Sequence, residues 1–388
     1  MAELFEELGL DLALVKALKI EKITIPTDIQ IRVIPKINCN NDVLMQSATG
    51  TGKTLAYLLP LFEKIKNTSK EMKAIILAPT HELVIQIKRQ IERLSQNSGL
   101  PIRSTAIIGG ANITRQIDNL KKKPQIIVGS PGRILELLQK NKIKSQTIEQ
   151  IIIDEADRLM DMHNVTEVFR IIKSLRKERQ IVIASATLPQ NIIDIARNIM
   201  VAPVLMKSEG TASIPESIAN IYLIAEQRDK IALLRKLIQN INPPKALVFL
   251  NNVDQIDNLI GKFQFHGIKA KSLHGTNKKM ERKRVMDGFK SGKIQVLIAS
   301  DIAARGLQMD GITYIFNMDI PESSKDYLHR AGRTGRNGLQ GVVVSLATIN
   351  EIPLLKRIEK KLKIKIENKV YFEGKIADKA GVNGDDLS

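Results

Sequence analysis

Cysteine, tryptophan and long apolar runs are scarce or missing in this chain of 388 residues. It has one cysteine, Cys39, and no tryptophan, and its aromatic content is 4%. A single thiol excludes an intrachain disulfide framework and a zinc site built from several cysteines. No apolar run reaches the length of about 18 residues that a membrane-spanning helix needs, and the first residues are acidic, unlike a signal peptide. These absences predict a cytoplasmic protein without a membrane partner.

Positive charge is in clear excess and is spread along the chain. The chain has 59 Lys and Arg residues against 41 Asp and Glu, a net charge of +18, and 43% of its residues are hydrophobic. Residues 1–211 have 30 basic and 22 acidic side chains (net +8), and residues 212–388 have 29 and 19 (net +10). The hydrophobic content is that of a globular protein, and the length suggests two domains. The distributed basicity favours a polyanion that both halves bind, although two unrelated basic surfaces would give the same counts.

Short β-branched apolar runs alternate with longer helix-like segments through the whole chain. This pattern is typical of buried parallel strands joined by crossover helices. It predicts two doubly wound α/β domains, residues 1–206 and 216–370, joined by a polar linker at 207–215 and followed by a short tail at 371–388. The expected strands are 42–46, 74–78, 105–108, 125–128, 151–153 and 181–184 in the first domain, and 221–224, 246–250, 270–273, 295–299, 314–316 and 342–346 in the second.

A phosphate-binding loop is predicted at residues 47–54, Ser-Ala-Thr-Gly-Thr-Gly-Lys-Thr, between an expected strand and an expected helix. Gly50 and Gly52 allow backbone N–H groups to surround phosphate oxygens at a helix N-terminus. Lys53 is suited to neutralise the β- and γ-phosphates, and the hydroxyl of Thr54 is suited to reach Mg²⁺. The order of strand, loop and helix distinguishes this segment from a chance Gly-Lys-Thr.

An acidic cluster follows the expected strand at 151–153. Asp154-Glu155-Ala156-Asp157 begins at the carboxyl end of that strand, where a buried carboxylate is costly unless it meets a cation. Asp154 is therefore a candidate ligand of Mg²⁺, and Glu155 is a candidate to orient and polarise the attacking water. A solvated turn would have the same composition, but the phosphate loop in the same domain favours the catalytic interpretation.

With these two motifs the chain resembles the DEAD-box family of ATP-dependent RNA helicases, in superfamily 2, and in particular its bacterial members. The resemblance extends from Phe5 to beyond Arg336, with the motifs of the family in their usual order. It implies two tandem RecA-like domains, ATP and Mg²⁺ as cofactors, and RNA-stimulated hydrolysis of ATP to ADP and phosphate. One chain carries both halves of the implied site, so a monomer is expected to suffice.

The resemblance assigns roles to further residues around the nucleotide. Pro26-Thr27-Asp28-Ile29-Gln30 resembles the Q motif of the family, in which Gln30 reads the adenine edge, and Ile23 stands where an aromatic residue usually stacks on the base. Gln308 stands where an Asp usually contacts the ribose. The residues implied in nucleotide binding are Ile23, Thr27, Gln30, Thr49, Gly50, Thr51, Gly52, Lys53, Thr54 and Gln308.

Two further motifs are implied in hydrolysis and in its coupling to unwinding. His329-Arg330-Ala331-Gly332-Arg333-Thr334-Gly335-Arg336 resembles the last motif of the family. Arg333 and Arg336 are the expected arginine fingers, which stabilise charge on the transferred phosphoryl group. His329 is expected to link these fingers to the motifs of the first domain. Ser185-Ala186-Thr187 resembles the motif that couples hydrolysis to strand separation, with Ser185 and Thr187 as its polar residues.

The motifs implied in RNA binding follow expected strands in both domains. Backbone N–H groups at such loops and helix starts meet phosphates. The implied residues are Pro79, Thr80, Gly109, Gly110, Pro131, Gly132 and Arg133 in the first domain, and Asn251, His274, Gly275, Arg282, Ser300 and Asp301 in the second. Few aromatics lie among these motifs. Backbone contacts to single strands and short duplexes, with little sequence preference and a steep salt dependence, are therefore expected.

Together the motifs predict an ATP-dependent RNA helicase that couples RNA-stimulated ATP hydrolysis to local unwinding of short duplexes and to ribonucleoprotein remodelling. The same motifs would serve an ATP-gated RNA clamp that assembles ribonucleoprotein with little unwinding. A DNA-tracking translocase is disfavoured by Gln30 and by Asp157 at the fourth acidic position. A nucleotide-independent RNA-binding protein is disfavoured by the complete set of nucleotide motifs. Ribosome-assembly and RNA-degradosome proteins are the partners that this interpretation allows.

Overall fold

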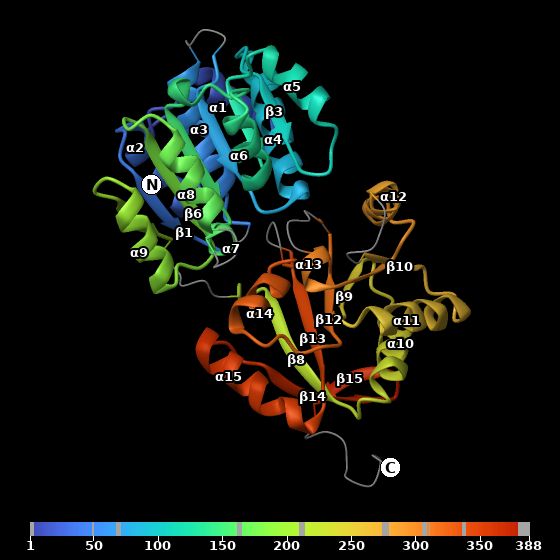
Figure 1. Ribbon diagram of the computed structural model, residues 1–388. Coiled ribbons are helices and arrows are strands. Elements are labelled where there is room, and N and C mark those ends of the chain that lie inside the picture. The colour runs from blue at the N-terminus through green and yellow to red at the C-terminus, as the bar shows by residue number, and fades with distance from the viewer. Residues whose placement is uncertain are drawn as a thin grey trace. The chain divides into compact units, whose positions relative to one another are not determined.

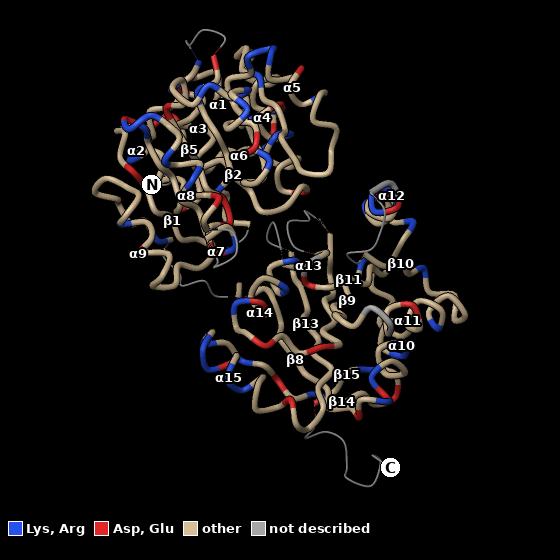
Figure 2. Tube along the Cα trace, viewed as in Figure 1, with Lys and Arg blue, Asp and Glu red and all other residues tan. Residues whose placement is uncertain are grey.

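The chain forms two α/β units, each with its own sheet and with helices on both faces of that sheet (Figure 1). The computed structural model describes residues 4–48, 50–66, 71–160, 165–208, 214–273, 279–304, 309, 311–335 and 339–378. The units are Met1–Thr211 and Ala212–Ser388. Within the described ranges, no helix has the length and apolar content needed to span a membrane. In Figure 2, Lys and Arg positions, coloured blue, occur along both units.

The first unit has a sheet of seven parallel strands in the order β3-β4-β2-β5-β6-β1-β7. This arrangement confirms the expected doubly wound fold. In chain order the elements are α1 (Leu12–Ile20), α2 (Asp28–Asn38), β1 (Val43–Gln46), α3 (Lys53–Ile65), β2 (Ala74–Leu77), α4 (His81–Ser98), β3 (Ser104–Ile107), α5 (Ile113–Lys121), β4 (Ile126–Gly129), α6 (Pro131–Gln139), the 3₁₀ turn η1 (Ser145–Thr147), β5 (Gln150–Asp154), α7 (Ala156–Leu159), α8 (Val165–Ser174), β6 (Gln180–Ser185), α9 (Gln190–Ile199) and β7 (Val204–Lys207).

Buried β-branched residues account for the central strands of this sheet. In β5, Ile152 belongs to one hydrophobic core and Ile151 and Ile153 to the other, because successive side chains of a strand point to opposite faces. Helices α1 to α4 contribute to the first core, and α5 to α9 to the second. Both faces of the sheet are therefore covered, as a parallel sheet requires.

The second unit has an eight-stranded sheet in the order β10-β11-β9-β12-β13-β8-β14-β15. All pairs are parallel except β14 with β15, which is antiparallel. Its elements are β8 (Ile218–Ile224), α10 (Lys230–Ile241), β9 (Ala246–Phe249), α11 (Val253–Phe265), β10 (Ala270–Leu273), α12 (Lys279–Lys290), β11 (Val296–Ala299), α13 (Asp301–Ala304), β12 (Tyr314–Asn317), α14 (Ser324–Ala331), β13 (Gly341–Ala347), the 3₁₀ turn η3 (Ile349–Glu351), α15 (Ile352–Leu362), β14 (Glu367–Phe372) and β15 (Lys375–Asp378).

The structure departs from the sequence-based expectation at the ends of both units. Residues 371–378, expected in a short tail, instead complete a hairpin in the second sheet. Glu373 and Gly374 have φ of 45° and 80° and form its two-residue turn, a backbone shape that matches the twist of paired strands. Tyr371 and Ile376 pack against a core of this unit, which explains why the hairpin is folded. In the first unit β7 was not expected, and its last residue, Lys207, lies in the segment expected to be a linker.

Candidate nucleotide and RNA sites

The phosphate loop predicted from the sequence joins β1 to α3 at the carboxyl edge of the first sheet. β1 pairs with β6, and beyond this pairing the N–H of Ser47 donates to the carbonyl of Ser185 at 3.1 Å. Gly50 and Gly52 have φ of 85° and 88°, in the left-handed region that favours glycine. Gly52 is the N-cap of α3, so the loop ends where the N–H groups of a helix N-terminus point at a ligand. Thr49 lies outside the described residues.

Hydrogen bonds within the loop hold its shape. The Nζ of Lys53 donates to the carbonyl oxygens of Ser47 and Ala48, both at 2.6 Å. The hydroxyl of Thr51 donates to the carbonyl of Ala48 at 2.8 Å and lies 2.6 Å from the hydroxyl of Ser47. Ser47, where the usual pattern has glycine, thus adds a side-chain contact to the loop. Burial lowers the pKa of Lys53, and the neighbouring carboxylates oppose that shift, so an anion beside the ammonium would be stabilising.

Gln30 connects the Q-motif helix α2 to the phosphate loop. Its Oε1 accepts from the N–H of Thr27 at 2.9 Å in the capping box of α2, and its Nε2 donates to the carbonyl of Gly52 at 3.2 Å. The hydroxyl of Thr27 donates to the carbonyl of Thr51 at 2.8 Å. Within the described part of the chain these bonds leave Gln30 one donor and one acceptor, the pair that an adenine edge complements. Ile23 is half-buried and packs against the first hydrophobic core.

The position of Gly52 beside Gln30 admits only glycine. A Cβ built on Gly52 would lie 2.4 Å from Nε2 of Gln30, closer than real contacts allow. The left-handed backbone of Gly52 would add strain to any other residue. The close approach of the two segments therefore depends on the absence of a side chain there.

Asp154 ends β5, and both of its carboxylate oxygens accept hydrogen bonds. Oδ2 accepts from the hydroxyl of the buried Tyr57 at 2.9 Å, and Oδ1 accepts from the N–H of Glu155 at 2.8 Å. Burial, and after it the charge of Glu155, raises the pKa of Asp154 to about 6. The Tyr57 hydroxyl also hydrogen-bonds the side chain of Thr54. One buried hydroxyl therefore contacts both residues that were predicted to reach Mg²⁺.

Tyr57 was missed by the sequence analysis, although a weak signal exists. It follows Thr54 by three residues on α3, and residues three apart on a helix share a face. That spacing places Tyr57 beside the candidate metal residue Thr54, but the partner in β5 is 97 residues away in the sequence. Burial raises the pKa of Tyr57 well above the usual value, so its hydroxyl stays a donor.

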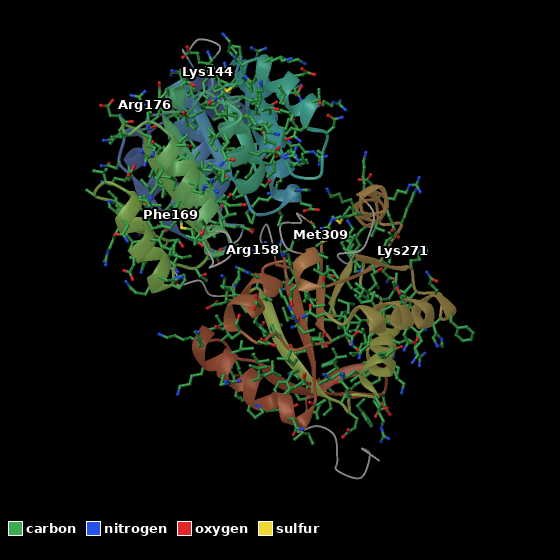
Figure 3. All side chains as sticks on the ribbon, in the orientation of Figure 1. Lys144, Arg158, Phe169, Arg176, Lys271 and Met309 are labelled. Carbon is green, nitrogen blue, oxygen red and sulfur yellow. The ribbon has the colours of Figure 1, made fainter. Side chains whose placement is uncertain are left out.

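Glu155 has a backbone conformation that is uncommon for a residue with a side chain. Its φ and ψ are both 50°, in the left-handed region, and it is the N-cap of the short helix α7. Such strain costs on the order of 1–3 kcal/mol and clusters at functional sites. Its carboxylate forms an ion pair with Nη1 of Arg158 at 3.3 Å (Arg158 is labelled in Figure 3). The structure thus holds the predicted general base directly after the predicted metal ligand, with part of its side chain accessible.

The two predicted coupling residues both contact Asp157. The N–H of Asp157 donates to Oγ of Ser185 at 3.2 Å, and Oγ1 of Thr187 donates to Oδ2 of Asp157 at 2.9 Å. β6, which carries Ser185, lies between β1 and β5 in the sheet. The end of β6 is therefore hydrogen-bonded both to the phosphate loop after β1 and to the acidic cluster at the end of β5.

The expected RNA contacts of the first unit lie in three loops at one edge of the sheet. β2, β4 and β3 are parallel neighbours, so the loops that follow them are adjacent. Nη1 of Arg133 donates to the carbonyl of Ala111 at 3.3 Å and joins two of these loops. Helices α4 and α6 begin at this edge and direct N–H groups toward it. The loops contain Pro79 and Thr80; Gly109 and Gly110; and Pro131, Gly132 and Arg133.

In the second unit, Asn251 and Asp301 follow the neighbouring strands β9 and β11 and bind each other. Nδ2 of Asn251 donates to Oδ2 of Asp301 at 2.9 Å, and the N–H of Asp301 donates to Oδ1 of Asn251 at 3.0 Å. Nη2 of Arg282 donates to the carbonyl of Ala303 at 2.8 Å, and the N–H of Ala303 donates to Oγ of Ser300 at 3.3 Å. Four predicted RNA contacts are therefore near one another. His274 and Gly275 lie outside the described residues.

Arg330, which the sequence analysis did not select, is the centre of a hydrogen-bond network in the second unit. The residue is 2% exposed. Its Nε and Nη2 donate to the two carboxylate oxygens of Asp301, both at 2.7 Å. Its Nη1 donates to Oδ1 of Asn317 at 2.9 Å and to the carbonyl of Asp319 at 2.6 Å, and the guanidinium lies 4.7 Å from the ring centre of Phe249. An arginine with a bidentate carboxylate pair and two further hydrogen bonds fixes the geometry around it.

His329 and Arg333, two of the predicted catalytic residues, border the same small pocket as Arg330. Arg333 is largely buried. Arg336 and Gln308 lie outside the described residues. The pocket is lined by Phe249, Asp301, Ala304, His329, Arg330 and Arg333. Predicted catalytic and RNA-contacting residues of the second unit therefore meet at one place.

The oxygen ligands at the end of β5 suit Mg²⁺. This ion keeps several waters and takes one or two protein oxygens together with substrate phosphates. The Asp154 carboxylate and the Thr54 hydroxyl, both in contact with Tyr57, are such a pair. Among the described residues, no group of three or more His, Cys, Asp or Glu side chains could hold a metal without a substrate. The donor set fits a metal that arrives with a nucleotide.

Comparisons with known proteins agree with these motifs. The sequence matches the family model described as DEAD/DEAH box helicase over residues 27–195 and the one described as Helicase conserved C-terminal domain over residues 229–338. It is 40% identical to the DEAD-box ATP-dependent RNA helicase CshC of Bacillus cereus, over 91% of this chain and 90% of that protein. The chain belongs to the DEAD-box family of ATP-dependent RNA helicases.

Other members of the DEAD-box family extend this likeness. The probable ATP-dependent RNA helicase YfmL of Bacillus subtilis is 39% identical, over 91% of this chain and 93% of that protein. Dbp5 of S. cerevisiae bound to RNA and ADP BeF3 has a TM-score of 0.85 at 28% identity, covering 94% of this chain and 95% of that one. Mss116p bound to ssRNA and AMP-PNP has a TM-score of 0.85 at 25% identity, covering 95% and 78%. The resemblance to bacterial members and the RecA-like fold are confirmed.

Proposed function

We propose that this DEAD-box helicase couples RNA-stimulated ATP hydrolysis to local separation of short RNA duplexes and to remodelling of ribonucleoproteins. The observation that carries the proposal is the linkage at β6. Ser185 and Thr187 contact Asp157, and Ser185 accepts a hydrogen bond from the phosphate loop. In this proposal, ATP hydrolysis and strand separation are linked through the end of β6. The ligands that are bound to Dbp5 and Mss116p support RNA and an adenine nucleotide as ligands here.

The residues around the phosphate loop receive distinct roles in this proposal. Gln30 reads the adenine edge with its remaining donor and acceptor. Lys53 exchanges its two carbonyl partners for phosphate oxygens, which stabilises its charge. Thr54 and Asp154 hold Mg²⁺, which when bound neutralises and orients the phosphates. The other residues proposed to contact the nucleotide are Ile23, Thr27, Thr49, Gly50, Thr51, Gly52 and Gln308.

Glu155 orients the attacking water and accepts its proton. It directly follows the metal ligand on a strained backbone, which fixes the carboxylate relative to Asp154. Arg333 and Arg336 supply positive charge to the transferred phosphoryl group, and His329 positions this motif. Removal of such an arginine typically slows phosphoryl transfer by about 10³–10⁵-fold.

The RNA is held mostly through its backbone. The loops after β2, β3 and β4 offer helix N-termini and small residues, which suit phosphates and sugars rather than base edges. Arg282, Asn251, His274, Gly275, Ser300 and Asp301 are the proposed contacts of the second unit. Binding with little sequence preference and a steep salt dependence follows from this composition.

The first test is steady-state ATP hydrolysis with and without structured RNA, with matched DNA as the control. Strong stimulation by RNA alone is expected. Glu155→Gln should nearly abolish turnover while ATP-dependent RNA binding persists, and Glu178→Gln, at an exposed glutamate of the same unit, should change neither. Undiminished hydrolysis by Glu155→Gln would contradict the role of Glu155.

Strand displacement separates unwinding from the alternative, an ATP-gated clamp that assembles ribonucleoprotein with little unwinding. Release of a short labelled strand in the presence of ATP supports the helicase; ATP-dependent retention of RNA without release supports the clamp. A monomeric state, a cytoplasmic location, and ribosome-assembly or degradosome proteins as partners stay predictions. Sedimentation tests the monomeric state, and affinity capture in cell extract tests the protein partners.

A further inference from the structure

The C-terminal part of the second unit carries a strongly basic surface on α15 and on the segment that follows it. Residues 352–369 contain seven Lys or Arg and two Glu, a net charge of +5 within a chain of net charge +18. The exposed residues of α15 are Pro353 and four cations, Lys356, Arg357, Lys360 and Lys361. Figure 2 shows basic residues along this helix. No residue that was predicted to contact RNA or nucleotide lies in this segment.

Four of these side chains have no ion-pair partner in the described part of the chain, and we call them the α15 cations. They are Arg357, Lys360, Lys361 and Lys363, and all four are exposed. The two glutamates of the segment are already engaged: Glu359 pairs with Lys356, and Glu367 pairs with Lys365 and Lys369. The α15 cations therefore present unneutralised positive charge to an external ligand.

Stabilisation of the helix explains only part of this cluster. Cations in the last turn interact favourably with the carbonyl end of a helix, by about 0.3–1 kcal/mol each. Lys360 and Lys361 are in that turn. Arg357 lies before it, and Lys363 follows the helix with φ of 53°. The buried face of α15, with Leu355 and Ile358, packs on the core and needs no charge opposite it.

The surface is within reach of an RNA bound at the proposed contacts. Leu355 and Ile358 of α15 belong to the same hydrophobic core as residues of β8 and β13, and Lys356 lies over the ring of Tyr222 in β8. Asn251 and Asp301 follow β9 and β11. In the sheet, β9 is separated from β13 by β12 alone, and β8 follows β13. Three strand spacings separate β9 from β8, about 14 Å at about 4.8 Å per strand. α15 starts after the carboxyl end of β13, and its 11 residues carry its last turn about 15 Å back along the sheet at about 1.5 Å per residue. The two regions are therefore on the order of 20–25 Å apart. A short duplex that continues from the strand bound at the proposed contacts spans that distance.

We propose that the α15 cations form a second RNA-binding surface, which holds the phosphate backbone of a structured segment adjacent to the strand on the proposed RNA path. The inference rests on the proposed function, because it assumes that RNA is the ligand of that path. Dispersed, unpaired cations without an apolar or aromatic anchor match a polyphosphate backbone, whereas a protein partner needs a packed centre. RNA is therefore the occupant that this surface fits.

The experiment compares two sets of charge-removing substitutions in the full-length protein. The test variant combines Arg357→Gln, Lys360→Gln, Lys361→Gln and Lys363→Gln. The matched control combines Lys122→Gln, Lys123→Gln, Lys142→Gln and Lys144→Gln, which removes the same charge from the first unit (Lys144 is labelled in Figure 3). These four positions are also exposed and have no ion-pair partner among the described residues. A third variant, with the three lysines of the test set changed to Arg, retains the charge. Equilibrium binding is measured over a series of salt concentrations, with a hairpin that has a single-stranded extension and with a single strand of about ten nucleotides.

The test variant should bind the hairpin RNA at least about tenfold more weakly near 0.15 M salt, with a salt slope smaller by about 2–4. Its affinity for the short single strand, and its kcat for ATP hydrolysis at saturating RNA, should match the wild type. The control and the Arg variant should keep wild-type affinity for both RNAs. Unchanged hairpin binding by the test variant, or an equal loss in the control, overturns the inference. Absence of RNA-stimulated hydrolysis in the wild type would instead overturn the proposed function.

Discussion

Replacement of Asp154 by Asn should stabilise the first unit at neutral pH although it removes the proposed metal ligand. Burial is the main cause that raises the pKa of this carboxyl from 3.8 to about 6. The folded state therefore binds the proton more tightly than the unfolded state, and ionisation above pH 6 costs stability. The difference of about 2 pKa units corresponds to about 3 kcal/mol near pH 7.5. A neutral Asn avoids this cost and is a similar shape.

The sign of the effect fixes its pH dependence. Between pH 6 and 3.8 the carboxyl is mostly protonated in the folded protein but still ionised in the unfolded chain, so the advantage of Asn shrinks steadily as the pH falls toward 3.8. It should be about half as large at pH 5 and vanish below the unfolded pKa. For a unit of this size, each kcal/mol shifts the midpoint by about 2–4 °C, so the gain at pH 7.5 is about 6–12 °C.

Calorimetry of the full-length protein in EDTA, at pH 7.5 and pH 5, measures this gain as a shift of the transition of the first unit. Asp118→Asn is the control, because that side chain is 56% exposed and its change should be within about 0.5 kcal/mol. ATP with Mg²⁺ should raise the wild-type transition and leave Asp154→Asn unmoved. A variant no more stable than the wild type at pH 7.5, or a gain that does not depend on pH, would refute the reasoning.

Three further substitutions test contacts in the two units. Gly52→Ala should weaken ATP binding at least about tenfold, because the added Cβ would lie 2.4 Å from the side-chain amide of Gln30. Binding is measured with a fluorescent ATP analogue. Gly50→Ala, where an added Cβ has no described atom within 4 Å, should weaken ATP binding less. Tyr57→Phe should weaken the dependence of ADP affinity on Mg²⁺, whereas Tyr327→Phe, at a buried tyrosine of the second unit, should not. Arg330→Leu should destabilise the second unit by about 3–5 kcal/mol in urea unfolding, since it leaves a carboxylate without its partner; a loss under 1 kcal/mol would contradict the central role of the network.

Most strands could be predicted from the sequence, including the edge strands β3 and β10, whereas β7, β14 and β15 could not. β5 is a continuous run of isoleucine because both faces of a central parallel strand are buried. β7 alternates half-buried with exposed residues, and β14 is half-buried throughout and contains charged residues. β7 lies at an edge of the first sheet, and β14 joins the edge strand β15 to β8. Neither β7 nor β14 has the continuous run of buried apolar residues that marks most of the other strands. The Glu373-Gly374 turn was the remaining signal for the hairpin.

In the candidate site, residues in short sequence motifs could be predicted, whereas residues that act through distant partners could not. Lys53, Thr54 and Asp154 follow strands in short motifs, and their neighbours in the sequence are also their neighbours in space. The hydroxyl of Tyr57 and the guanidinium of Arg330 meet partners that are far away along the chain. Such contacts depend on which strands are adjacent and how helices pack on them, and no short motif records that. The residues that support the motifs are therefore known only once the packing of strands and helices is known.

The network around Arg330 also bears on how this protein tolerates substitution over time. The guanidinium of Arg330 contacts Phe249, Asp301, Asn317 and the backbone of Asp319. The side chain of Arg330 is almost fully buried. A change at Asp301, Asn317 or Arg330 leaves its partners with an unmatched charge or hydrogen bond, so a single change is costly, whereas replacing the partners together by apolar residues is often neutral. We therefore expect these positions to vary together among related sequences, as one inherited block rather than as independent sites.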